Sequence, residues 1–178
     1  MARLLAEIVR TALANSAREL LRCDAMLRLG GGPEGVHGAR VAVRRMRSDL
    51  RSFEPFLEHD WACSLREEMG WLGTALGLVR DADILVQRLE GDVEALPDDD
   101  RTPAYLVLGG FRSARDAAHA TLDTTLHEAR YAELLARVVT AGRHPVLGAR
   151  AGESARDGLA EVLQMSWKRL RKTVRGRT

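Results

Sequence analysis

Apolar residues recur every three or four positions along most of the chain, and this spacing restricts the fold more than any other feature. The first example runs from Leu4 to Leu27 and predicts a helix over about residues 3–28. No segment alternates apolar and polar residues in the way that a half-buried strand does. The sequence therefore predicts an all-α protein.

Glycine and proline divide the rest of the chain into further helices. The runs GGGPEG, LPDDDRTP and AGRHPVLGARAG are expected to be connections, because these residues interrupt a helical pattern. Helices are expected over about residues 33–54, 60–90, 103–129 and 131–141, with a last one from about residue 153 onwards. Short connections favour an antiparallel up-and-down helical bundle, expected as a single domain over residues 1–178.

Three glycines, Gly70, Gly73 and Gly77, lie inside the third predicted helix. Glycine disfavours a helix interior relative to alanine, so its presence there usually has a packing reason. We therefore expect another helix to approach closely along these glycines.

Composition and charge exclude several classes of protein. Lys and Arg number 27 against 25 Asp and Glu, so any basic character is local rather than global. No apolar run approaches the roughly 18 residues of a membrane span. Glu7 and Arg10 interrupt an apolar start that otherwise resembles a leader peptide. Cys23 and Cys63 form no C-x-x-C pair and are expected to be reduced and mostly buried. The expectation is a cytoplasmic protein without a membrane segment.

The segment VHGARVAVRRMRSDLRSF, residues 36–53, contains five arginines, one histidine and a single acid. On a helix with about 100° per residue, five of its basic residues form a stripe about 80° wide and about 21 Å long. We call this stripe the arginine row; its members are His37, Arg40, Arg44, Arg47 and Arg51. Arg45 falls off the row. A second, apolar stripe lies about 120° away and is expected to pack into the bundle; it consists of Ala39, Val43, Met46, Leu50 and Phe53.

The arginine row has two explanations. Like charges along one helix face repel one another, and the row contains no acid that relieves the repulsion. An external anion would relieve it, and arginine binds phosphate oxygens with two parallel hydrogen bonds. Alternatively, acids from neighbouring helices neutralise the row. Asp81 and Asp83 in GLVRDADIL are expected to brace arginines or His37 in this way, rather than to act as catalytic acids.

The carboxyl-terminal segment WKRLRKTVRGRT holds six basic residues and no acid. Four of them, Lys168, Arg171, Lys172 and Arg175, share one helix face, and an apolar face is expected to point inward; it consists of Leu163, Trp167, Leu170 and Val174. Such a tail is either a solubilising terminus or, together with the arginine row, the second wall of one groove.

Motifs for catalysis and for cofactor binding are absent from the sequence. It contains no Gly-rich phosphate loop, no dinucleotide fingerprint and no nucleophile elbow. His59 and Cys63 are four residues apart, but two ligands do not make a metal site. The sequence therefore favours binding over catalysis, with no cofactor, no metal and no enzymatic activity.

Two of these segments resemble the CHAD domains (conserved histidine α-helical domains). The H-x-x-R-x-x-x-R-R-x-R pattern of VHGARVAVRRMRSDLRSFEPFL is similar to the first basic helix of the family, and LGLVRDADIL is similar to its LG-x-x-R-D-x-D segment. RYAELLARVV and WKRLRKTVRGR match more loosely. The elements occur in the family's order and cover most of the chain.

The resemblance implies a helical bundle whose basic surface binds inorganic polyphosphate, in the cytoplasm or on polyphosphate granules. By this resemblance the polyphosphate contacts are His37, Arg40, Arg44, Arg45, Arg47 and Arg51, with Lys168, Arg169, Arg171 and Lys172 as secondary contacts. The family usually carries a second basic helix of the same pattern, which this sequence lacks. By the resemblance the chain corresponds to about the amino-terminal half to two-thirds of the usual domain. It is then a truncated form, a naturally short form, or a chain that forms a homodimer in which a second copy supplies the second basic helix.

Two other classes of function stay open on the sequence alone. A helical module could bind nucleic acid as a non-specific polyanion, although few aromatic residues accompany the basic segments. The basic face could instead dock an acidic protein partner. A phosphohydrolase is the least favoured reading, because the sequence has no acidic cluster of the E-x-E-x-K kind that would hold a metal and a triphosphate.

Overall fold

The computed structural model describes residues 4–175, which form α-helices joined by short connections. In chain order they are α1 (Leu5–Arg28), α2 (Gly32–Ser52), α3 (His59–Glu94), α4 (Asp98–His127), α5 (Ala129–Arg143) and α6 (Ala155–Arg175). Two short 3-10 helices, η1 (Glu54–Phe56) and η2 (Ala149–Gly152), lie in the connections. Between residues 4 and 175 there is no strand, only two isolated bridges. The predicted all-α class is confirmed.

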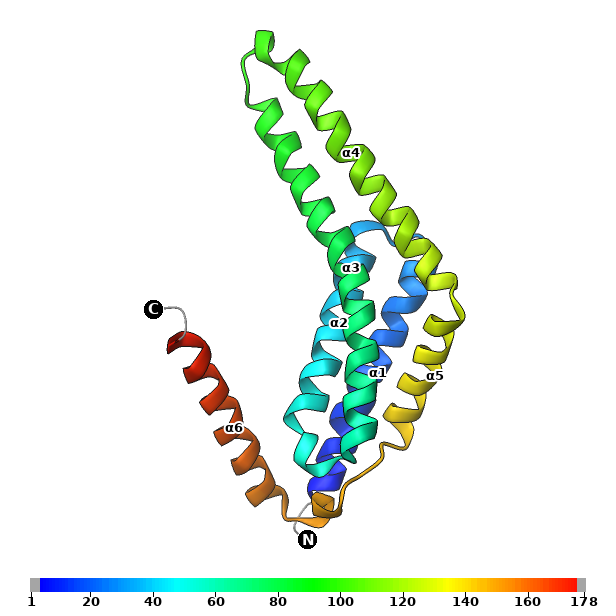
Figure 1. Ribbon diagram of the computed structural model, residues 1–178, viewed down its shortest axis with the longest axis vertical. Helices are drawn as coiled ribbons and strands as arrows, with labels where there is room; N and C mark the ends of the chain where they lie inside the picture. The colour runs from blue at the N-terminus through cyan, green and yellow to red at the C-terminus, as the bar shows by residue number, and fades with distance from the viewer. Residues whose placement is uncertain (1–3, 176–178) are drawn as a thin grey trace.

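Helices α1, α2 and the first half of α3 pack side by side, each antiparallel to the one before it (Figure 1). Their apolar stripes form one hydrophobic core, in which Leu13, Met46, Leu65 and Leu72 are fully buried. Helix α5 covers the other side of α1 and adds the buried Tyr131 and Val138. The second half of α3 and the first half of α4 continue past this core as a two-helix arm (Figure 1).

The start of α4 differs from the prediction. The sequence predicts a loop over LPDDDRTP, whereas α4 begins at Asp98 and includes Pro103. Three aspartates occupy its first turn, where negative charge interacts favourably with the helix dipole. Arg101 donates hydrogen bonds to the carbonyl oxygens of Glu94 and Leu96 at the end of α3. These interactions stabilise a tight turn in place of an open loop.

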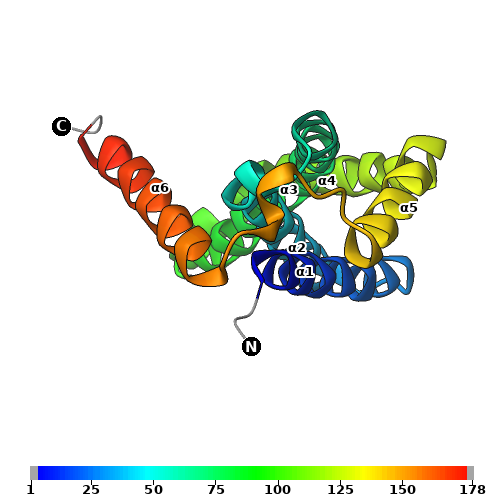
Figure 2. The same cartoon turned by 90° about the horizontal axis from the view of Figure 1, so that it is seen from below.

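The last two helices depart from simple up-and-down alternation. Helix α5 continues in the direction of α4 after a break at Glu128, where the backbone is extended. Helix α6 starts beside the amino-terminal end of α1 and then leaves the bundle at an angle (Figures 1 and 2). Within residues 4–175 no helix is long and apolar enough to cross a lipid bilayer.

The apolar face of α6 does not point inward, which corrects the expectation from the sequence. Its four residues are 54–70% exposed; they are Leu163, Trp167, Leu170 and Val174. Only the first turns of α6 are anchored. Gly158 lies directly against Leu5, and Leu159 and Val162 pack on the core. Beyond these turns the helix diverges, so no described element lies against its apolar face.

Candidate anion-binding surface

Packing of α2 fixes the direction in which the arginine row points. The apolar stripe predicted for this helix is buried, with Ala39, Val43, Met46 and Leu50 at most 1% exposed and Phe53 at 8%. His37, Arg44, Arg47 and Arg51 are exposed on the neighbouring face, and Arg40 is partly covered. The predicted division of α2 into a buried and a basic face is therefore confirmed.

The glycines of α3 lie along the row. A side chain at Gly73 would meet Val43 Cγ1 at 3.3 Å, and one at Gly77 would meet Arg40 Nη1 at 3.3 Å. Gly70 faces the guanidinium of Arg47, with Nη2 3.6 Å from the position of a Cβ. The close approach predicted from these glycines is present, and it lets the two guanidinium groups lie against the α3 backbone.

Arg40 is the member of the row that has a partner on another helix. Its Nη1 donates to the carbonyl oxygen of Gly77 at 3.1 Å and to Asp81 Oδ1 at 2.9 Å. The Asp81 side chain is 71% exposed, so solvent screens this ion pair and its contribution to stability is small. The two contacts fix the position of Arg40 and leave Nη2 and Nε without a partner among residues 4–175.

Arg44, Arg47 and Arg51 form the unneutralised part of the row. Together with Ser48 they line a cavity of about 220 Å³. None of the three arginines makes a hydrogen bond or an ion pair with any residue between 4 and 175. Ser48 was not among the predicted site residues, although helical spacing places it one turn after Arg44 on the same face. This cavity presents guanidinium donors and a hydroxyl without an acid to neutralise them.

Arg45 lies on another side of α2, towards α1. Burial raises the pKa of the Asp49 carboxyl, while a hydrogen bond from Ser16 and the charge of Arg45 act in the opposite direction. The charge of Arg45 also acts on Glu19 of α1. The structure therefore does not bring Arg45 together with the arginine row.

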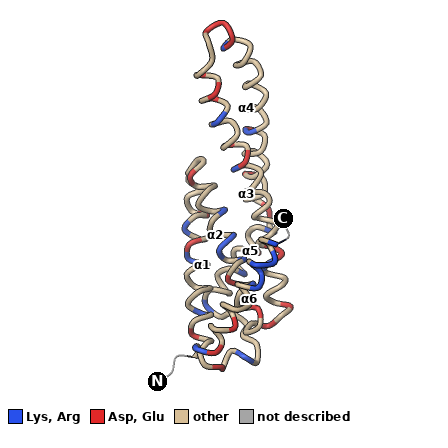
Figure 3. The backbone as a smooth tube through the Cα atoms, turned by 90° about the vertical axis from the view of Figure 1, so that its left-hand side faces the viewer, with Lys and Arg blue, Asp and Glu red and all other residues tan. Residues whose placement is uncertain are grey.

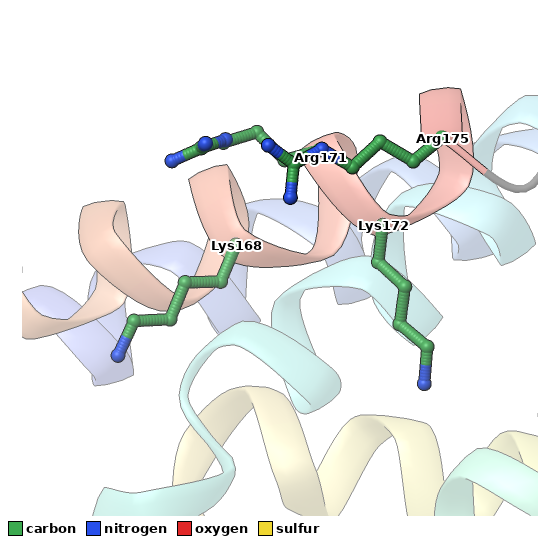
Figure 4. A pocket seen from close by; sticks show the side chains of 4 residues that line it. All are labelled: Lys168, Arg171, Lys172 and Arg175. Atoms are coloured by element: carbon green, nitrogen blue, oxygen red, sulfur yellow. The ribbon is translucent and has the colours of Figure 1, made fainter.

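The basic residues of α6 line two different cavities. Lys168, Arg171, Lys172 and Arg175, all from α6, line one open space of about 560 Å³ (Figure 4). Arg169 instead lines a cavity of about 500 Å³ that it shares with Arg51. Arg51 and Arg169 are thus the point at which the two basic segments meet. In the view of Figure 3, Lys and Arg positions (blue) occur along both α2 and α6. Arg177, the last basic residue of the segment, lies outside the described residues.

Asp83 has a different partner from the one expected. Its Oδ1 is 2.8 Å from His119 Nε2 of α4, and its side chain is almost completely buried. The expected contact with an arginine of α2 or with His37 is not made, because the Asp83 side chain points towards α4. Nothing in the sequence pattern identifies His119 as this partner, beyond the rule that a buried carboxylate needs one.

Comparison with known proteins assigns this helical architecture to a protein family. A family model described as the CHAD domain matches residues 11–178. The chain belongs to the CHAD-domain family. No curated protein matches it.

The solved structures that share its fold include a protein from Streptomyces and a plant domain. PptA from Streptomyces chartreusis superposes with a TM-score of 0.81 at 22% identity, covering 97% of this chain and 60% of that one. The CHAD domain from the plant Ricinus communis gives a TM-score of 0.68 at 26% identity, covering 96% of this chain and 56% of that one. The chain thus spans a little over half the length of each. That the chain lacks the family's second basic helix stays a prediction.

Proposed function

We propose that this protein binds inorganic polyphosphate through the arginine row, without catalysing its hydrolysis. The observation that carries the proposal is the cavity lined by Arg44, Arg47, Ser48 and Arg51, whose guanidinium groups have no acidic partner within residues 4–175. Membership of the CHAD domains supports it, because the family is linked to polyphosphate binding.

The shape of the row fits a linear polyanion. His37 and Arg51 are separated by about 21 Å along the helix axis, so several consecutive phosphates can contact one face of α2. Arginine contacts phosphate through two parallel hydrogen bonds. These hydrogen bonds need only phosphate oxygens, so a ligand without nucleotide bases can make them. His37 and Arg40 extend the contact towards the arm, and Arg169 extends it onto α6 at Arg51. Lys168, Arg171 and Lys172 are secondary contacts in this proposal, and Arg45 contributes only at long range.

Nucleic acid is the second candidate ligand, and one observation favours it. Trp167 is 60% exposed beside the basic residues of α6, where its ring is available to stack on a base. No comparable ring accompanies the arginine row, because Phe53 is buried. We therefore place nucleic acid second, as a non-specific polyanion. An acidic protein partner has no specific observation in its favour.

The location and the assembly follow from the proposed function. A polyphosphate-binding module would be found in the cytoplasm and on polyphosphate granules. A homodimer stays a prediction: the exposed apolar face of α6 is the surface that a second copy would cover.

Binding of a long polyphosphate at two salt concentrations tests the function. The parent is compared with Arg44→Glu/Arg47→Glu and with the control Arg88→Glu/Arg143→Glu, which makes the same charge change at two exposed positions away from the row. With about five phosphate contacts, we expect the parent to lose about two decades of affinity between about 50 and 200 mM salt. The row variant should lose most of its binding and the control little. Equal losses in both variants would show that net charge alone determines binding.

A further inference from the structure

The corner between α2 and α3 brings together three side chains of metal-ligating type. Glu54 begins η1, His59 is the first residue of α3, and Cys63 follows one turn later on the same face. Their ligand atoms all lie within 4.8 Å of one another. Glu54 Oε1 is 3.5 Å from His59 Nδ1, and Cys63 Sγ is 4.0 Å from the same nitrogen. The sequence spacing paired His59 with Cys63 but did not indicate Glu54, because only the turn at η1 brings Glu54 close to them.

The corner is fixed by its own contacts. Phe56 in η1 is fully buried, and Leu57 pairs with Leu147 in an isolated bridge. The side chain of Glu58 accepts hydrogen bonds from the backbone N–H groups of Asp60 and Trp61, which caps α3 beside His59. The three side chains therefore project from anchored backbone rather than from a free loop, as a ligand site requires.

The distances suit a tetrahedral ion of the zinc class. With zinc bonds of about 2.0–2.1 Å to nitrogen or oxygen and about 2.3 Å to sulfur, neighbouring ligand atoms lie roughly 3.3–3.6 Å apart. Two of the separations are 3.5 and 4.0 Å and all three are within 4.8 Å, so the side chains must move closer together to reach this range. A thiolate, an imidazole and a carboxylate together favour zinc over magnesium or calcium, which prefer oxygen ligands alone.

Arg66 contributes the outer contact that such sites usually have. Its Nη1 donates to Glu54 Oε2 at 3.1 Å, which is the oxygen that does not face His59. Its Nη2 lies 3.6 Å from Cys63 Sγ. Outer contacts of this kind orient the ligands of a metal, so Arg66 holds the carboxylate with Oε1 directed towards the other two ligand atoms. Cys63 is also half-exposed, whereas Cys23 is buried, so an ion can reach this thiol.

We propose that Glu54, His59 and Cys63 bind one zinc-class ion, whose fourth position is open to the cavity shared by Arg51 and Arg169. Glu54 and His59 themselves line that cavity of about 500 Å³. Three protein ligands leave one position of a tetrahedral ion for an outside group. A phosphate oxygen in that position would be bound by the ion and both arginines. This last statement rests on the proposed polyphosphate binding; the metal site itself does not.

Titration of the reduced, metal-free full chain with Co²⁺ and with Zn²⁺ tests the site. We expect one equivalent of Co²⁺ to give a thiolate-to-metal charge-transfer band in the parent and in the exposed-histidine control His144→Ala. The band should vanish in Cys63→Ser, and Zn²⁺ affinity should fall at least about 100-fold in His59→Ala and Cys63→Ser. No band in the parent, or equal Zn²⁺ affinity in all four proteins, would overturn the proposal.

A second experiment separates the metal site from the proposed function. Binding of a short polyphosphate is measured with and without one equivalent of Zn²⁺, in the parent and in Cys63→Ser. Because polyphosphate itself chelates zinc, the variant supplies the background. Zinc should tighten binding about tenfold in the parent only, as one added charge-assisted contact does. The same change in both proteins would overturn the phosphate contact. Zinc binding without any polyphosphate binding would overturn the proposed function and leave the metal site standing.

Discussion

Helices α2 and α6 are built alike in sequence and are placed very differently in the structure. Each has 21 residues, a basic face and an apolar face. The apolar face of α2 is buried, with Met46 and Leu50 fully covered, whereas Trp167 and Leu170 of α6 are more than half exposed. An amphipathic pattern thus determines which residues share a face, but the partner of that face comes from the rest of the fold.

This difference affects how each helix can bind an anion. The side chains of Arg40 and Arg47 lie against the glycines of α3, so part of their conformational freedom is already lost before a ligand arrives. Lys168 and Lys172 extend from a part of α6 whose neighbouring apolar residues, Trp167 and Leu170, are more than half exposed (Figure 4). A ligand that contacts α6 must also order these side chains, which weakens each contact.

The largest difference between the two helices should be in stability. Leu50→Ala removes a fully buried side chain from α2 and should lower the free energy of unfolding by about 2–5 kcal/mol. Leu170→Ala makes the same chemical change at a position 54% exposed on α6 and should change it by less than about 0.5 kcal/mol. Denaturant unfolding followed by circular dichroism measures both. A loss of several kcal/mol in Leu170→Ala would show that the apolar face of α6 is covered in solution, as in a homodimer.

The second comparison concerns polyphosphate affinity. Arg44→Glu/Arg47→Glu on α2 and Lys168→Glu/Lys172→Glu on α6 change the net charge equally. We expect a loss of about 100-fold or more for the α2 pair and about tenfold for the α6 pair, because the α2 guanidinium groups line one cavity on a packed helix. Titration at one fixed salt concentration measures both. A larger loss for the α6 pair would make α6 the main contact surface.

The sequence predicted what depends on local spacing and missed what depends on distant packing. The arginine row and its buried counterpart followed from positions along one helix, since a helix fixes the angle between its residues. The inward direction assigned to Leu163 and Trp167 was wrong, because no local rule says whether a partner lies against that face. The same limit hid the pairing of Asp83 with His119, which are 36 residues apart.

Glu54 illustrates a third kind of limit. It lies beyond the end of α2 in a 3-10 turn that contains Pro55. The helical spacing of α2 and that of α3 therefore do not predict where its side chain points. The spacing of His59 and Cys63 predicted two ligands on one face, and only the geometry of the turn adds the third. Short irregular turns therefore escape periodicity arguments even when they lie next to predictable helices.

The close approach of α3 holds α2 more firmly than any helix holds the outer part of α6. Substitution of Gly73 tests the importance of this approach. In Gly73→Ala the new methyl group would meet Val43 Cγ1 at 3.3 Å, so the Val43 side chain must shift by a few tenths of an ångström in a closely packed contact between α2 and α3. We expect a loss of about 1 kcal/mol in stability, because repacking outweighs the better helix propensity of alanine. Gly91→Ala on the same helix meets nothing within 4 Å and should gain about 0.5–1 kcal/mol. Thermal unfolding of both variants measures these changes in stability. Equal gains would mean that the contact between α2 and α3 at Gly73 accommodates a methyl group without strain.

The smallest effect should come from the ion pair at the end of the row. Asp81→Asn keeps an oxygen that can accept from Arg40 and removes only the negative charge, and Gly77 still holds the guanidinium. Removing one like charge about 8 Å from a bound phosphate in water is worth about 0.5 kcal/mol, so polyphosphate should bind about twofold more tightly at low salt. Asp92→Asn, an exposed change in the arm, is the control and should change affinity less. Weaker binding in Asp81→Asn would instead show that the charge of Asp81 positions Arg40 for phosphate, and that the order of the α2 side chains matters more than their summed charge.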